Sequence, residues 1–144
     1  MNSSQPPPVP IMRWISKVNV VVYRLTKGRV ANTLNGAPIC LVTMTGARSK
    51  KRITIPLMYT AHGDEVILVA SMGGAPKNPP WYHNLKAHPE IEIQVGGWRR
   101  VMRAAEADDE QRTRLWPVAV RNYPPFEDYQ RRTSRKIPMF VCST

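Results

Sequence analysis

The spacing of apolar residues between positions 38 and 107 is that of antiparallel β-strands. Five short, largely apolar runs are bounded by segments rich in Gly, Pro, Lys or Asp: 38–45, 52–60, 65–71, 90–95 and 98–107. In the fourth run the alternation is strict, so Ile91, Ile93 and Val95 face one side while the glutamates and Gln94 face the other. Most of these runs are joined by tight turns, which predicts that neighbouring strands pair antiparallel.

Residues 11–27 instead have the period of an amphipathic helix. The apolar positions recur every three or four residues: Ile11, Trp14, Ile15, Val18, Val21, Val22 and Leu25. The opposite face is basic, and two interpretations are open. Such a helix either packs on its own domain or lies on an anionic bilayer with Trp14 near the headgroups. The proline-rich residues 1–10 before it predict a flexible, extended leader.

Two more helices are predicted from local signals. One spans residues 79–88, with Asn78 as its N-cap and Pro79 as its first helical residue. The other begins after Asp108, which can form a capping box with Gln111, and runs to about residue 121. An aromatic, partly helical segment over 123–136 then leads to a last apolar strand over 137–142.

Together these elements predict an α+β fold that is mainly β. Five or six antiparallel strands with helices packed outside form a small, partly open barrel. At 144 residues with 42% hydrophobic side chains, the chain can bury the core of one domain, which we place at residues 11–144. Strand and helix do not alternate as they do in a parallel nucleotide-binding sheet.

The net charge of +11 is distributed unevenly along the chain. All ten acidic residues lie at or after Asp64, whereas the preceding segment holds only basic charges. That basic half predicts an anionic partner, which could be a phosphorylated or carboxylated cofactor, an anionic membrane surface or nucleic acid. Trp98 with Arg99, Arg100 and Arg103 is the segment that would best suit nucleic acid, by stacking and phosphate contacts.

Cysteine and histidine usage gives no sign of a metal site or a disulfide framework. Cys40 and Cys142 each lie in an apolar run, which predicts reduced, buried thiols. The three histidines lack the spacing of metal ligands. Neither a secretory signal nor an apolar run of about 20 residues is present, so we expect a cytoplasmic protein that holds no metal.

The stretch from Val69 to Leu85 is the strongest candidate for a binding site. It reads as a strand end, two glycines at 73 and 74, a Lys-Asn-Pro-Pro sequence and a helix that begins with Trp81. Glycines allow close backbone approach, a helix N-terminus with Lys77 beside it favours an anion, and Trp81 offers a flat surface. The alternative is an ordinary strand-to-helix connection with Trp81 in the core.

Two other segments could carry chemistry. The turn 45–52 combines four cations with the hydroxyls of Thr45 and Ser49 and suits a polyanionic tail, although many such turns are merely solvated. Tyr123, Phe126 and Tyr129 are three residues apart, so their rings could line one wall of a cleft or simply pack in the core. A phenol in such a wall can orient a carbonyl or nitro oxygen or donate a proton.

In chain order, the motifs are Thr-Gly-x-Arg-Ser, Ile-Pro-Leu, Ala-Ser, Gly-Gly-x-x-Lys-Asn-Pro, Trp-Tyr-x-Asn-Leu, Leu-Trp-Pro, Tyr-Pro, Asp-Tyr and Ile-Pro. This order resembles the deazaflavin-dependent nitroreductase family, the coenzyme F-420-dependent split β-barrel oxidoreductases of actinobacteria. The resemblance extends from residue 11 to residue 142 and is most specific over SMGGAPKNPPWYHNLKAHP. It implies a split barrel that passes a hydride from the reduced deazaflavin to a quinone-like, nitroaromatic or enone acceptor.

The resemblance also implies roles for individual residues. The phosphate and oligoglutamate tail would be held by Arg48, Ser49, Lys50, Lys51 and Lys77. The ring would lie along Ala70, Ser71 and Met72, beside Pro56 and Met58 and near Asn78, with Pro80 and Trp81 over one face. The acceptor pocket would be walled by Tyr123, Phe126 and Tyr129, and the candidate proton donors are Ser71, Tyr123 and Tyr129.

This chain departs from the family pattern in three places. The turn usually reads Gly-Arg-Lys-Ser-Gly-x-Pro-Arg, and here one arginine, the second glycine and the proline are replaced, so the charge is kept but redistributed. Met72 stands where a relative carries Lys. Phe126 stands where a prodrug-reducing relative carries Tyr, which favours quinone over nitro reduction. Two other classes stay open: a split-barrel protein that uses FMN or binds haem, and a non-enzymatic basic module for membranes or nucleic acid.

Overall fold

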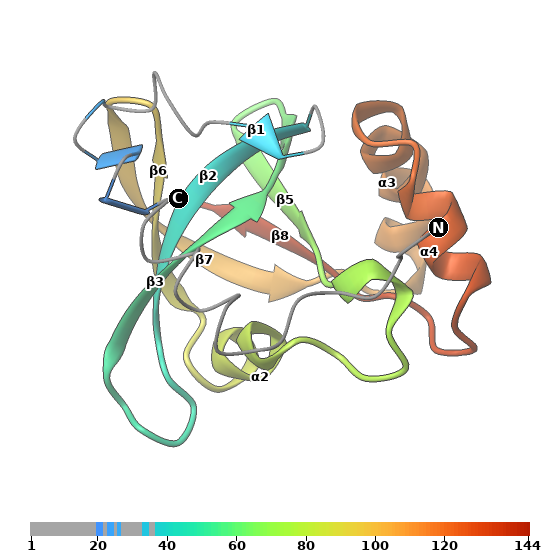
Figure 1. The fold of residues 1–144 in the computed structure, drawn as a ribbon, viewed down its shortest axis with the longest axis horizontal. Helices are drawn as coiled ribbons and strands as arrows, with labels where there is room; N and C mark the ends of the chain where they lie inside the picture. Colours follow the sequence, from blue (N-terminus) through green and yellow to red (C-terminus); the bar gives the residue numbers. More distant parts are fainter. Residues whose placement is uncertain (1–19, 22, 25, 27–32, 35–36) are drawn as a thin grey trace, which may run out of the picture.

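The computed structural model describes residues 20–21, 23–24, 26, 33–34 and 37–144. Eight antiparallel strands form the centre of the fold (Figure 1): β1 Thr33–Leu34, β2 Ala37–Thr45, β3 Arg52–Met58, β4 Thr60–His62, β5 Glu65–Val69, β6 Glu90–Val95, β7 Trp98–Glu106 and β8 Met139–Ser143. A short 3-10 helix, η1, spans Met72–Gly74. The α-helices are α2 Pro80–Ala87, α3 Asp109–Asn122 and α4 Phe126–Arg131.

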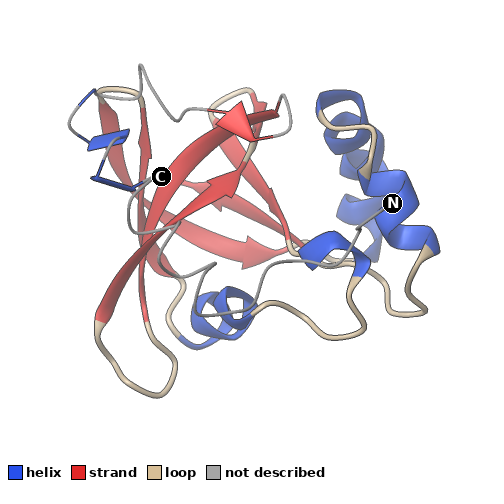
Figure 2. Cartoon of the chain, viewed as in Figure 1, coloured by secondary structure: helices blue, strands red, loops and turns tan. Residues whose placement is uncertain are grey.

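The strands are hydrogen-bonded in the order β1-β2-β6-β7-β8-β5-β4, and β3 pairs with the other edge of β2. Every pairing is antiparallel. Because β3 also contacts β5, the sheet curls on itself into a split β-barrel. The expected fold class is therefore confirmed. As Figure 2 shows, α3 and α4 lie together on one side of the strands, and α2 lies below the strands in this view.

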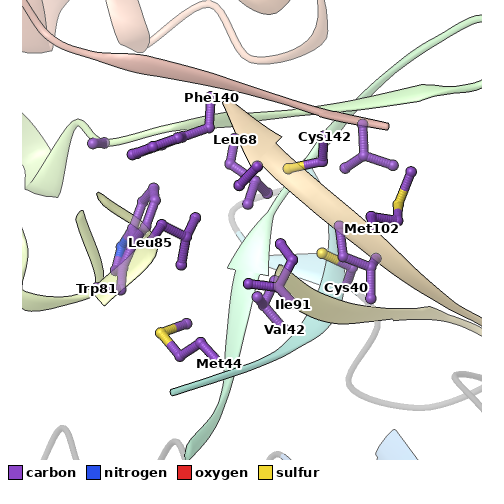
Figure 3. Packing of buried hydrophobic residues seen from close by; sticks show 14 residues of the cluster. Cys40, Val42, Met44, Leu68, Trp81, Leu85, Ile91, Met102, Phe140 and Cys142 are labelled. Atoms are coloured by element: carbon purple, nitrogen blue, oxygen red, sulfur yellow. The ribbon is translucent and has the colours of Figure 1, made fainter. Parts of the chain in front are cut away.

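The barrel interior holds the largest hydrophobic cluster of the described residues, which is drawn in Figure 3. Residues of β2, β5, β6 and β7 point inward, and Trp81 and Leu85 of α2 close one end by packing beneath Phe140 of β8. Cys40 and Cys142 lie in this cluster as free, buried thiols, as expected. Burial raises the pKa of both thiols, to about 12 for Cys142, so they behave as inert core groups.

A second cluster joins the barrel to the two C-terminal helices. Ile67, Met139 and Val141 contribute its barrel side, while Leu115, Ala119, Tyr123 and Phe126 contribute the helical side. The helix α3 begins with the predicted capping box. The Asp108 carboxylate accepts a hydrogen bond from the backbone N–H of Gln111 at 2.8 Å, and the Gln111 side chain accepts one from the backbone N–H of Asp108 at 3.2 Å. This cluster places α4 beside the end of β5, where η1 begins.

Several boundary predictions are wrong. The run 52–60 is two strands, since β3 ends at Met58 and β4 begins at Thr60. The third strand ends at Val69, and the last one spans Met139–Ser143, two residues later at its start than predicted. The helix α2 begins at Pro80 with Pro79 in the N-cap position and no side-chain cap, so Asn78 does not cap it.

The described N-terminal residues are helical and pack on the barrel through Val20 and Tyr23. The Tyr23 hydroxyl accepts a 2.6 Å hydrogen bond from the Gly96 amide. Gln94, on the face opposite Ile91 and Ile93, is only 5% exposed. The predicted helix 11–27 is thus described only in part, and the predicted leader 1–10 lies outside the described residues.

Candidate functional site

The turn between β2 and β3 projects from the barrel and carries exposed cations. Arg48, Lys50 and Lys51 are exposed together with Ser49, whose hydroxyl accepts a hydrogen bond from the Lys51 amide at 3.2 Å. Gly46 closes the turn through backbone hydrogen bonds in both directions. Lys50 adopts a positive φ of 59°. The turn therefore presents its charges to solvent on a backbone of defined shape.

This turn is fastened to the barrel by one side chain of α2. The side-chain oxygen of Asn84 accepts a 2.8 Å hydrogen bond from the backbone N–H of Ala47, and the side-chain NH2 of Asn84 donates to the sulfur of Met44 at 3.5 Å. Asn84 is the asparagine of the Trp-Tyr-x-Asn-Leu motif, for which the sequence assigned no role. It couples the middle of α2 to the cationic turn.

The loop after β5 contains a run of left-handed backbone. Met72, Gly73 and Gly74 have φ values of 46°, 65° and 82°. Met72 holds this conformation without being glycine, at a cost of about 1–2 kcal/mol, and its side chain is 52% exposed. Within residues 37–144 the backbone N–H groups of Ser71 and Met72 donate no hydrogen bond. The loop thus offers strained backbone and free donors at one surface.

Gly74 brings this loop against α4. A Cβ added there would lie 2.6 Å from the carbonyl oxygen of Tyr129 and 3.0 Å from its Cα. A Cβ on Gly73 would meet nothing within 4 Å. Gly74 is therefore required both by its φ and by the close approach of another backbone, whereas Gly73 is required by its φ alone.

The three predicted wall residues do gather in one cluster. The ring centroids of Tyr123 and Phe126 are 5.0 Å apart, and each lies about 6 Å from that of Tyr129, at 6.1 Å and 6.2 Å. Tyr123 and Phe126 are each only 4% exposed, so Tyr129 is the member that reaches the surface. The role of these residues in binding an acceptor stays a prediction.

The hydroxyls of Tyr123 and Tyr129 are 3.0 Å apart. Burial, together with this hydrogen bond, raises the pKa of Tyr129 to about 12. The nearby Arg132 guanidinium, 5.5 Å from the ring centroid of Tyr129, acts in the opposite direction but does not prevail. The phenol is therefore neutral at physiological pH and able to donate a hydrogen bond.

The structure places Trp81 in the core. It is 9% exposed and its ring centroid lies 5.9 Å from that of Phe140. This packing agrees with the core interpretation, and the ring-covering role of Trp81 stays a prediction. Pro80, by contrast, is exposed at the start of α2.

The other predicted residues fall into two groups. Pro56 and Met58 are partly buried on β3, opposite Leu41 and Ile39 of β2. Ala70 is fully buried, Ser71 and Asn78 are partly buried, and Lys77 is exposed. The structure thus brings Ser71, Met72 and Tyr129 to one place through Gly74, and it holds the cationic turn beside α2.

A residue that the sequence analysis missed organises the whole loop. The guanidinium of Arg135 donates to the carbonyl oxygens of three loop residues: Ala70 at 3.2 Å, Ser71 at 2.9 Å and Ala75 at 2.8 Å. It also donates to the Asn78 side chain at 2.6 Å. Asn78 is therefore an internal partner of Arg135, which is why it does not cap α2.

The chain matches the model of a family described as F420H(2)-dependent quinone reductase over residues 14–144. The chain belongs to this family. The protein is accordingly an oxidoreductase, and the resemblance found in the sequence is confirmed.

Individual relatives agree. An F420H(2)-dependent quinone reductase of Mycobacterium tuberculosis (strain H37Rv) is 38% identical over 145 residues, covering 92% of this chain and 97% of the relative. Among solved structures, an F420-H2 dependent reductase (FDR-A) has a TM-score of 0.69 at 42% identity, covering 74% of this chain and 94% of that chain. A structure described as a domain-swapped dimer has a TM-score of 0.71 at 36% identity, covering 92% and 99%.

More distant structures share the fold only. A heme binding protein from Mycobacterium smegmatis has a TM-score of 0.57 at 10% identity, covering 81% of this chain and 49% of that chain. Such a likeness places the chain in the split-barrel fold and says nothing of haem in this protein.

The described residues contain neither a membrane-spanning helix nor a metal-binding cluster. In the described part of the chain, no helix is long and apolar enough to cross a membrane. Residues 37–144 and the described N-terminal positions contain no group of three His, Cys, Asp or Glu that could hold a metal ion. A cavity of about 460 Å³ is lined by residues outside the predicted site, among them Tyr59, Val66, Trp98 and Arg100.

Proposed function

We propose that this protein transfers a hydride from reduced coenzyme F-420 to a quinone-like acceptor. The observation that carries the proposal is the family match over residues 14–144, because it covers the glycine loop, the cationic turn and the aromatic cluster together. When bound, the reduced deazaflavin supplies the hydride, so the protein needs no nucleophile of its own. Its residues bind, orient and exclude water.

The loop after β5 suits the edge of a flat ring. Its glycines lack Cβ, and the N–H groups of Ser71 and Met72, which donate no hydrogen bond within residues 37–144, can pair with ring oxygen or nitrogen atoms. Pro56 and Met58, which are partly buried on β3, are assigned to apolar contact with the ring, whereas Ala70 is fully buried; Pro80 is exposed at the start of α2. In this assignment the ring lies along the loop, toward α4.

The cationic turn suits the anionic tail. Arg48, Lys50 and Lys51 are exposed on a turn without acidic residues, and Ser49 adds a hydroxyl. Arg binds phosphate or carboxylate in a fork, whereas Lys acts as a mobile point charge. Lys77, exposed between the loop and α2, is assigned to the same tail.

Tyr129 is the residue we assign to the acceptor. Its phenol is partly exposed and stays protonated, and it can donate its single proton to a quinone oxygen when Tyr123 is the donor of the hydroxyl pair. Ser71 is the second candidate donor. It lies in the same loop as Gly74, whose backbone approaches Tyr129. Phe126 has no hydroxyl to offer to a nitro group, which supports quinones over nitroaromatics as acceptors.

The test is a fluorescence titration with coenzyme F-420 beside FMN and haem, followed by oxidation of the reduced cofactor with menadione. We expect saturable binding of coenzyme F-420, and turnover that is faster with menadione than with a nitroimidazole. Tighter binding of FMN or haem than of coenzyme F-420 would overturn the cofactor assignment. Cofactor binding without menadione turnover would overturn the acceptor assignment only.

We also propose that the N-terminal helical segment contacts an anionic membrane, where a lipid-dissolved quinone would be found. Val20 and Tyr23 pack on the barrel, whereas Val21 is 55% exposed and is directed away from it. Arg24 is exposed nearby. The charge and the apolar face together fit an anionic bilayer surface.

Cosedimentation with phosphatidylglycerol vesicles tests this contact. We expect Val21→Asp to weaken binding to the vesicles, whereas Val101→Asp, at an equally exposed apolar position on β7, leaves it unchanged. Equal loss in both variants, or no binding of the unaltered protein, would show that this segment is not the anchor.

A further inference from the structure

Arg135 occupies an unusual position for a charged residue. It is partly buried between α4 and β8, and within the described part of the chain no carboxylate lies within ion-pair distance of it. Its guanidinium is satisfied by three backbone carbonyls and one side-chain amide, all between residues 70 and 78. Such a set of four acceptors turned toward one side chain fixes the loop backbone.

The direction of these carbonyls determines what the loop can offer elsewhere. The Ser71 carbonyl also accepts from the Gly74 amide at 2.9 Å, so Arg135 and the tight turn share one acceptor. In a trans peptide unit the C=O and N–H groups point in opposite directions. Because the carbonyls of Ala70 and Ser71 point toward Arg135, the N–H groups of Ser71 and Met72 point away from it. Arg135 therefore determines which backbone groups of the loop remain available, because it binds the carbonyl oxygens of Ala70 and Ser71.

The backbone of Arg135 is tied to the acceptor side. Its carbonyl accepts from Gln130 of α4 at 2.8 Å, and the same Gln130 side chain accepts from the Ile137 amide at 3.0 Å. Arg112 of α3 completes the connection by donating to Gln130 at 2.8 Å and to the Ile137 carbonyl at 2.8 Å. One residue thus joins the loop to the two helices that carry Tyr123 and Tyr129.

We propose that Arg135 is a positioning residue that sets the distance between the loop after β5 and the aromatic wall of α4. The proposal rests on the function proposed above, in which the loop holds the hydride donor and the wall holds the acceptor. Hydride transfer needs the reacting atoms at about 3–3.5 Å, and a shift of about 1 Å can cost on the order of 100-fold in rate. Loss of Arg135 therefore lowers kcat more than it lowers affinity.

The central variants are Arg135→Met, which keeps the length of the aliphatic stem, and Arg135→Lys, which keeps the charge. The matched control is Arg131→Met, which removes one exposed Arg paired with Asp128 on the same helix. We expect kcat with menadione to fall about 10- to 100-fold in Arg135→Met, with the KM for menadione changed by less than about threefold. Arg135→Lys should recover little, because one ammonium cannot reach four acceptors.

Two readouts separate positioning from general support of the fold. The amides of Gly74 and Ala75, which donate within the loop, should exchange with solvent faster in Arg135→Met than in Arg131→Met, while the amides of β6 and β7 keep their protection. Millimolar guanidinium should restore part of kcat in Arg135→Met and none in the control. A proportional loss of protection everywhere, or kcat equal to that of Arg131→Met, would overturn the proposal.

The failure of this inference can be told apart from the failure of the proposed function. If the unaltered protein binds no coenzyme F-420, the proposed function fails, and local loss of loop protection in Arg135→Met would still show the clamp. If the unaltered protein binds and turns over but Arg135→Met does so equally well, the function stands and the positioning role is refuted.

Discussion

The two ends of the candidate site are held in opposite ways. The loop between Ala70 and Asn78 is held by four hydrogen bonds from Arg135, by a backbone contact at Gly74 and by three left-handed residues. The turn at residues 46–52 is fastened to the rest of the barrel through Asn84, and its Arg and Lys side chains extend into solvent.

This difference matches what each end has to do. Hydride transfer depends steeply on distance, so the ring end needs a rigid backbone. Attraction of a flexible anionic tail depends on charge that falls off gently with distance, so the other end needs cations on mobile side chains. Substitutions at the ring end should therefore act through geometry, and those at the tail end through charge.

The largest effect is expected at Gly74. In Gly74→Ala the new Cβ meets the Tyr129 backbone as well as an unfavourable φ, whereas Gly73→Ala suffers from φ alone. We expect the free energy of unfolding to fall by about 1–2 kcal/mol in Gly73→Ala and by about 1–3 kcal/mol more in Gly74→Ala. Urea denaturation with kcat measurements on both variants provides the check.

Gly97→Ala is the matched control, because that glycine has ordinary φ and open space around its Cβ. It should change stability by less than about 0.5 kcal/mol. Equal destabilisation in the variants at 73 and 74 would mean that α4 can move away from the loop, and the rigid half of the comparison would then be wrong.

The second prediction concerns the Tyr129 phenol. Tyr129→Phe removes the hydrogen-bond donor and keeps the ring, so we expect kcat with menadione to fall on the order of 10-fold or more with little change in cofactor affinity. In the unaltered protein the pKa of about 12 keeps the phenol protonated, so its ionisation should cause no decline in rate below pH 10. A pH–rate profile of both proteins tests this.

The same pKa makes a prediction about stability. The folded-state pKa of Tyr129 is raised above its ordinary value of 10.0, so the proton is held more tightly in the folded state. This contribution to stability is complete below pH 10 and is lost as the pH rises toward 12. Alkaline unfolding followed by circular dichroism should therefore show a smaller loss over that interval in Tyr129→Phe than in the unaltered protein.

The fold was largely predictable because its signals are local. Alternation over 90–95, the glycine pair at 96 and 97 and the capping box at Asp108 each depend on residues a few positions apart. The prediction failed where one apolar run serves two partners: β3 pairs with β2 up to Met58, and β4 pairs with β5 from Thr60. Periodicity does not show where a strand changes its neighbour.

The candidate site was predictable as a set of segments but not as a set of contacts. Motif resemblance identified the loop and the turn, yet Arg135 hydrogen-bonds residues 57 to 65 positions earlier in the chain, and its local sequence carries no sign of this. Capping propensity favoured Asn78, which Arg135 instead engages. Asn84 stood in a quoted motif, and that was the signal that could have revealed its role.

The next prediction tests the hydrogen bond that joins the turn to α2. Asn84→Ala leaves the Ala47 amide without its acceptor, and we expect a loss of about 1 kcal/mol in unfolding free energy. Affinity for full-length coenzyme F-420 should fall by a few-fold, because the cations are no longer presented together. His83→Ala, an exposed neighbour on α2, serves as the control and should change neither quantity.

The smallest effects are expected from single cations of the turn. Lys51→Ala removes one exposed charge, so the affinity for coenzyme F-420 should weaken by about 1 kcal/mol or less, and less still as salt is raised. The decisive comparison is chemical. A deazaflavin that lacks the phosphate and glutamate tail should bind the unaltered protein and Lys51→Ala equally well, with little dependence on salt. If the tail-free compound is as sensitive to Lys51→Ala and to salt as the full cofactor, the turn acts on the ring and not on the tail. The division between a geometric end and an electrostatic end would then be incorrect.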